Sequence, residues 1–172
     1  MEVGVVREKI IISFFIKLFG KKNVDTNIKT TEKELDVKCF NENISIKTIT
    51  GFKGPKLIWT VDSNQAKIFT KNYSPKCSII LVIIDWDQKT EWGGLYYIPI
   101  SVQIKILKQM KEEYFKLPKI NTNPRGVEMS AIALKKIINE KESKKIKIDW
   151  KKNKLNYDPL ERWVNEWNKV QD

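Results

Sequence analysis

Two oppositely charged residues, Asp36 and Lys47, lie on neighbouring short segments rich in apolar residues, and Ser45 stands two positions before the lysine. These residue types could act on a phosphodiester. A carboxylate can hold a divalent ion such as Mg²⁺, and a cation can activate water and stabilise charge that develops on the phosphate oxygens. Asp36 and Lys47 supply one of each, although a solvated charged face would show the same pattern.

Two predicted strands, 35–40 and 44–50, must position these side chains. We expect a hairpin with a two-residue turn at Asn41-Glu42, which would set Asp36 opposite Lys47. Side chains alternate between the faces of a strand, so the apolar residues of the hairpin share a face that packs on the core. The residues expected on the other face are Glu34, Asp36, Lys38, Ser45 and Lys47.

The hydrophobic pattern elsewhere predicts a mixed α/β fold with a central mixed sheet flanked by helices. Further strands are expected at 24–30, 78–84, 95–100 and 145–150, and helices at 5–19, 62–72, 102–116 (capped by Ser101), 126–140 and after Asp158. We expect one domain over residues 1–172, with a core over about 5–100. Residues 101–172 would then be helical, basic additions for recognition or dimerisation.

Composition excludes several kinds of chemistry. The 172 residues include no His, which rules out Ser-His-Asp and Cys-His triads and His-ligated zinc, and the two Cys cannot form a disulfide framework. The apolar run at 10–20 is too short to span a bilayer, and no signal-peptide cleavage site follows it. We therefore expect a cytoplasmic protein that does not contact a membrane. The net charge of +11 favours a nucleic-acid partner, although a lysine-rich genome would produce the same bias.

The stretch ELDVKCFNENISIKTITG, residues 34–51, resembles the signature of the PD-(D/E)XK nuclease superfamily, the fold of many type II restriction endonucleases. The predicted order of helix, three strands, helix and strand over residues 5–85 is also similar to the core of that family. With the segments IWTVD and GGLYYIPI, the layout resembles the small restriction enzymes of the ThaI type. The resemblance implies Mg²⁺-dependent cleavage of double-stranded DNA.

The sequence departs from the family pattern at the (D/E)-x-K triplet, where Ser45 replaces the acidic residue. In one branch of restriction enzymes a serine stands here and the following helix provides the carboxylate. Asp62 follows Lys47 by 15 residues, so the resemblance implies that Asp36 and Asp62 hold the metal while Lys47 assists the water and phosphate. It also implies a supporting role for Glu8 on the first helix. Asp62 would otherwise be a helix cap, and Glu8 a solvated residue.

Several polar side chains are candidates for contacting DNA. Asn and Arg before the helix expected at 126 could bind phosphate or read base edges, or could simply form a helix-start turn. The lysine-rich run at 141–154 would bind phosphates independently of sequence, or would protect a strand edge. A glycine-flanked loop near residue 54 carries two further lysines. The candidates are Asn121, Asn123, Arg125, Lys53, Lys56, Lys151 and Lys152.

These observations predict a type II restriction endonuclease that works as a homodimer on a palindromic site, since two-fold symmetry matches a palindrome. A Holliday junction resolvase is an alternative with a similar hairpin and helix layout. A non-catalytic DNA-binding protein on a decayed nuclease core is another, because Ser45 leaves the site short of negative charge.

Overall fold

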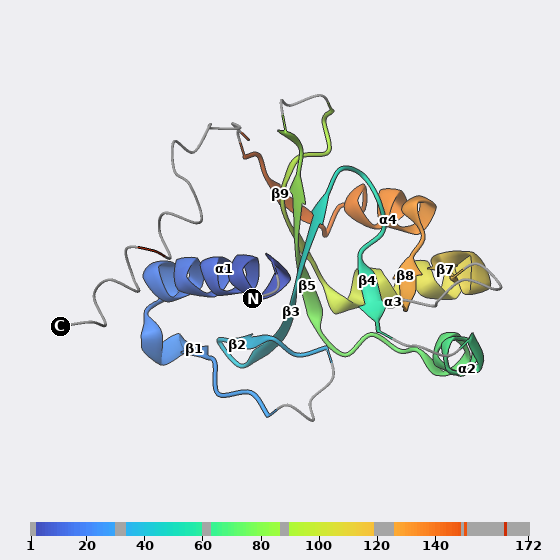
Figure 1. Ribbon diagram of the computed structural model, residues 1–172, viewed down its shortest axis with the longest axis horizontal. Coiled ribbons are helices and arrows are strands. Elements are labelled where there is room, and N and C mark those ends of the chain that lie inside the picture. The colour runs from blue at the N-terminus through green and yellow to red at the C-terminus, as the bar shows by residue number, and fades with distance from the viewer. Residues whose placement is uncertain are drawn as a thin grey trace.

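A computed structural model describes residues 3–29, 34–59, 63–86, 90–118, 126–148, 150 and 164 (Figure 1). Six of the predicted site residues lie outside these ranges, namely Asp62, Asn121, Asn123, Arg125, Lys151 and Lys152.

The described part of the chain contains a six-stranded mixed sheet, as expected, in the order β1-β2-β3-β5-β6-β9. The two longest strands, β3 and β5, pair in parallel over seven residue pairs, and the other neighbours are antiparallel. The strands are β1 Val24–Asp25, β2 Val37–Cys39, β3 Glu42–Thr50, β5 Ser78–Ile84, β6 Gly94–Ile98 and β9 Lys144–Ile146.

A smaller antiparallel sheet in the order β4-β8-β7 lies beside the main one (Figure 1). Its strands are β4 Lys56–Ile58, β8 Val127–Met129 and β7 Phe115–Lys116. The helices are α1 Val3–Phe19, α2 Ser63–Asn72, α3 Ile100–Met110 and α4 Ala131–Ile138, with short 3₁₀ turns at Lys21–Asn23 and Lys111–Tyr114.

The central strand β5 is buried along its whole length, because helices cover the sheet on both faces. Alternate side chains of β5 enter two different apolar clusters. Leu81 packs in the cluster that contains residues of α3 and α4, and Val82 packs in the cluster that contains Phe15 of α1. Figure 1 shows α1 on one side of the sheet and α3 and α4 on the other. None of the described helices combines the length and apolar composition needed to cross a bilayer.

The hairpin register differs from the predicted one. The turn lies at Phe40-Asn41, where φ is 49° and 66°, instead of at residues 41–42. Two positive φ values are those of a type I′ turn, whose twist suits a two-residue hairpin. Val37 pairs with Ile44, and the same register places Asp36 opposite Ser45, so the prediction that Asp36 faces Lys47 is wrong. The shift is two residues, and the predicted division of the hairpin into two faces is therefore retained.

Two helices also differ from the prediction. Helix α3 begins at Ile100 with Pro99 as its N-cap, so Ser101 is not the cap. The helix ends at Met110 because Lys111 adopts a φ of 52°. Strand β8 occupies residues where a helix from 126 was predicted, and α4 begins only after Ser130, whose hydroxyl accepts a hydrogen bond from the N–H of Ala133. The candidates just before residue 126 therefore precede a strand instead of a helix N-terminus.

Candidate active site

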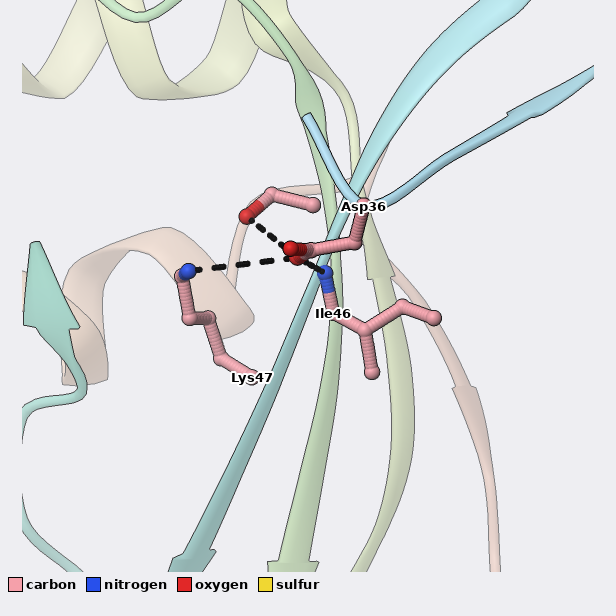
Figure 2. Close-up of polar contacts among 4 residues, drawn as sticks. Asp36, Ile46 and Lys47 are labelled. Carbon is pink, nitrogen blue, oxygen red and sulfur yellow. Dashed lines mark hydrogen bonds and ion pairs between the residues drawn. The ribbon is translucent and has the colours of Figure 1, made fainter. Parts of the chain in front are cut away.

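One carboxylate oxygen of Asp36 is the point where the polar contacts of the hairpin meet (Figure 2). Oδ2 accepts a hydrogen bond from the backbone N–H of Ile46 at 2.5 Å and another from the hydroxyl of Ser45 at 3.1 Å. Both donors lie on β3, so the sheet holds a carboxylate that stands just before β2. This arrangement fixes the direction of the Asp36 side chain.

The ammonium group of Lys47 lies 4.0 Å from the same Asp36 oxygen, and the two side chains are 24% and 22% exposed. Ser45, two residues earlier on the same face of β3, is only 2% exposed. The polar face of the hairpin therefore runs from the protein interior towards solvent, with the ion pair at the accessible end. A charged pair that is neither buried nor fully solvated can meet a substrate while keeping much of its electrostatic strength.

Glu8 joins these residues from α1. Its side chain is half-buried, and burial, followed by the negative charge of Asp36, raises the pKa of the Glu8 carboxyl. The positive charges of Lys47 and Lys9 act in the opposite direction. The structure thus brings Glu8, Asp36 and Lys47 into one electrostatic site, although 28 residues separate the two carboxylates in the sequence.

Glu34 is a further charged residue beside this site, and it was not among the predicted catalytic residues. It lines a small pocket together with Ser45 and Lys47. Burial raises the pKa of the Glu34 carboxyl. The positive charge of Lys47, a hydrogen bond with the backbone of Lys76 and the positive charge of Lys76 lower this pKa. The available signal was the strand alternation, which places Glu34 and Asp36 on one face of the hairpin.

The donors gathered here are carboxylate oxygens, the ligand type that Mg²⁺ prefers. Within the described ranges, no group of three or more Asp, Glu, His or Cys residues is close enough to form a metal site by itself. Mg²⁺ commonly binds through one or two carboxylates together with water and substrate phosphates. The carboxylates of Glu8 and Asp36 are ligands of the type that such a Mg²⁺ site uses.

Comparison with known proteins identifies the family. The family model of restriction endonuclease ThaI matches residues 1–169. The chain belongs to the ThaI restriction endonuclease family. A solved structure described as a restriction endonuclease in complex with substrate DNA is 50% identical, with a TM-score of 0.88, over 98% of this chain and 81% of the other. No curated protein matches the chain.

Membership of the ThaI family makes this chain an endodeoxyribonuclease, and it confirms both the predicted class of enzyme and the restriction-endonuclease-like fold. It also favours a restriction endonuclease over the two alternatives that the sequence left open, a junction resolvase and a non-catalytic binding protein. The assignment of individual site residues depends on the geometry described above.

Two of the predicted DNA-contacting lysines are described, and they differ in environment. Lys53 is exposed in the loop before β4. Lys56 begins β4 and is half-buried, and its ammonium group lies 3.3 Å from the centre of the Trp59 ring. Both flank the same turn of the chain near Gly54, which packs so closely on the backbone of Met129 that a Cβ would lie 1.6 Å from its carbonyl oxygen.

Proposed function

We propose that this chain is a Mg²⁺-dependent type II restriction endonuclease that works as a homodimer and hydrolyses double-stranded DNA at a short palindromic site. Asp36, Lys47 and Glu8 would form its active site. The observation that supports this most directly is the meeting of a partly buried carboxylate, a lysine ammonium 4.0 Å away and a second carboxylate from α1.

Glu8 and Asp36 would hold the Mg²⁺ ion. When bound, the ion would stabilise negative charge on the phosphate oxygens. Burial and, after it, the negative charge of Asp36 raise the pKa of the Glu8 carboxyl, and a cation bound beside both carboxylates would favour their charged forms. Asp62, the metal ligand expected from the family resemblance, stays a prediction.

The protein's own groups would orient the reactants. The N–H of Ile46 and the hydroxyl of Ser45 hold Asp36 Oδ2 in place before substrate arrives. Lys47 would then face the scissile phosphate with a fixed positive charge, stabilise the negative charge that grows in the transition state, and orient the attacking water. Because these groups are already positioned, little reorganisation would accompany the reaction.

Ser45 has a supporting part in this scheme. It stands where the family signature carries an acid, yet its hydroxyl donates to Asp36. A serine at this position therefore stabilises the carboxylate beside it instead of adding a second one. Under this proposal Glu8 supplies the negative charge that Ser45 does not provide.

Duplex DNA would bind through lysine side chains near the active site, where Lys53 and Lys56 would contact the phosphate backbone. The candidates outside the described ranges stay predictions, namely Asn121, Asn123, Arg125, Lys151 and Lys152. The homodimer follows from chemistry, because one active site cuts one strand and a two-fold axis relates the two strands of a palindrome.

The test is a digest of long unmethylated DNA with Mg²⁺, with EDTA and with no metal. We expect discrete, reproducible bands only with the metal, and the mapped ends would give the recognition site. A smear would contradict site-specific cleavage, and cleavage in EDTA would contradict the metal requirement. Light scattering of the D36N variant with a duplex that carries the mapped site would test the dimer, for which two chains per duplex are expected.

A further inference from the structure

Trp59 is exposed to an unusual degree for its size. Its side chain is 71% exposed, the largest fraction among the large hydrophobic side chains of the described residues. An indole offers a wide apolar surface that favours burial. A tryptophan side chain left this open to solvent points to a surface that another molecule covers.

The position of Trp59 relates it to the active site. Leu57, two residues earlier on β4, lines the same small pocket as Lys47 and Ser45. Two residues of extended chain span at most about 7 Å. The Cα of Trp59 therefore lies within about 7 Å of the Cα of a residue that lines the pocket beside Lys47.

The backbone that carries Trp59 is firmly held. Ile58 pairs with Val127 across β4 and β8, and Leu57 is buried in the main apolar cluster. Gly126 approaches so closely that a Cβ there would lie 1.9 Å from the carbonyl oxygen of Ile58 and 3.0 Å from the Cα of Trp59. The exposed ring is thus presented by a packed sheet.

Lys56 completes the arrangement. Its ammonium group lies over the Trp59 ring at 3.3 Å from the ring centre, a close cation–π contact. On β8, Glu128 lies opposite Lys56 in the strand register and binds Lys116 at 2.9 Å. A flat aromatic surface and a positive charge therefore stand together, which is the combination that nucleic-acid-binding surfaces use for bases or sugars and for phosphates.

We propose that Trp59 and Lys56 bind one strand of the DNA substrate next to the cleavage site, with the indole against a sugar or base and the ammonium group against a phosphate. This inference rests on the proposed function of the active site and adds a binding residue to it. The chain's net charge of +11 favours such a polyanionic partner over an apolar protein surface.

The experiment measures binding of a labelled duplex by fluorescence anisotropy in the inactive D36N background, over a range of salt concentrations. Trp59→Ala should weaken binding by about 5- to 100-fold, the effect of losing one aromatic stacking contact, whereas Trp59→Phe should stay within about threefold because a ring is retained. Lys56→Ala should lower the slope of log affinity against log salt by about one.

The matched control is Ile132→Ala, which removes another exposed apolar side chain, 64% exposed, from α4. It should leave binding unchanged. Binding by Trp59→Ala equal to that of the control would overturn the proposal. The proposal would also be overturned if Trp59→Ala bound DNA normally but no longer had the mass of a dimer, because Trp59 would then be a contact between copies of the chain.

Cleavage by the enzyme with Asp36 intact separates the two hypotheses. If that enzyme cleaves DNA with Mg²⁺ and Trp59→Ala cleaves and binds equally well, only the Trp59 assignment fails. If the enzyme with Asp36 intact cleaves no DNA, the proposed function fails. Lys56→Ala keeps the test decisive even if Trp59→Ala unfolds, because an unchanged salt slope in that variant would also overturn the proposal.

Discussion

Two aspartates at the main sheet make nearly identical hydrogen bonds and yet differ in what surrounds them. Oδ2 of Asp36 accepts one backbone N–H and one hydroxyl, from Ile46 and Ser45. Oδ2 of Asp85 also accepts one backbone N–H and one hydroxyl, both from Thr90 at 2.7 Å. Hydrogen bonding alone therefore does not distinguish a catalytic carboxylate from a structural one.

The charged neighbours distinguish them. Asp85 is 8% exposed and binds a residue only five positions along the chain, so it closes its own loop. Lys145 and Lys147 line a pocket with Asp85, but among the described residues no ion pair within 4.0 Å joins a lysine ammonium to Asp85. Asp36 bridges to a neighbouring strand and has Lys47 beside it, with Glu8 close enough for the two carboxylates to repel each other. The proposed catalytic carboxylate therefore differs from Asp85 in having a lysine ammonium 4.0 Å away.

The largest expected effect comes from exchanging each aspartate for asparagine. Asp36→Asn should reduce DNA cleavage by about 10³-fold or more, because the charge that would hold the metal is lost, with a melting temperature close to that of the original protein. Asp85→Asn should keep cleavage within about threefold but lower the melting temperature by several degrees. Single-turnover cleavage and thermal melting measure the two effects, and a reversal of the two patterns would refute the comparison.

Lys47→Ala should follow, with a loss of about 10²- to 10³-fold in the cleavage rate, the effect of removing one preorganised positive group from a transition state. Lys105→Ala is the matched control, since Lys105 forms an ion pair with Glu140 at 2.7 Å on an exposed helix surface. Its cleavage rate should be unchanged. Equal losses in both variants would mean that any lysine removal weakens DNA binding.

Glu8→Gln should cost about 10- to 100-fold in cleavage, which is the range for losing an oriented group at a metal site. Stability should move in the opposite direction. Burial and Asp36 raise the pKa of the Glu8 carboxyl, so its ionisation opposes folding as the pH rises above the ordinary value of 4.5. In EDTA, Glu8→Gln should therefore melt higher at pH 7 and at an unchanged temperature near pH 4, and a lower melting temperature at pH 7 would contradict this.

The smallest effect is expected for Ser45→Ala. The N–H of Ile46 still holds Asp36 when the hydroxyl is removed, so the cleavage rate should fall by only about 5- to 10-fold, the equivalent of about 1 kcal/mol for the net contribution of one hydrogen bond. Thr90→Val removes the corresponding hydroxyl from Asp85 and should leave the rate unchanged. A loss of 10³-fold for Ser45→Ala would instead assign the hydroxyl a direct role with the phosphate.

Elements with strong local signals could be predicted from the sequence. The β-branched run that forms β5, the helix α2 and the division of the hairpin into two faces followed from periodicity. The register did not, because the polar pair Asn41-Glu42 suggested a turn one residue later than the observed one, where Phe40 adopts a positive φ. Strand β8 was predicted as part of a helix because its partner β4 lies about 70 residues away in the sequence.

The geometry of the proposed active site could be predicted only in part, for similar reasons. Strand alternation placed Asp36, Ser45 and Lys47 on one face of a local hairpin, but the expected pairing of Asp36 with Lys47 was wrong. The position of Glu8 depends on how α1 packs against β3, which the sequence pattern does not specify and which only the family resemblance indicated. Glu34 stood on the predicted face, but its burial beside Lys47 depends on Tyr73, which follows α2, and on Gln103 of α3, which line the same pocket.

The parallel pairing of β3 with the buried strand β5 has a consequence for how the enzyme loses its activity when heated. Ser45, Ile46 and Lys47 all pair with β5, so the strand that carries Lys47 belongs to the part of the sheet whose amide protons should exchange most slowly with deuterium. Local opening away from α1 and the hairpin of β2 and β3 would leave the proposed site assembled. Thermal inactivation should therefore coincide with global unfolding instead of preceding it.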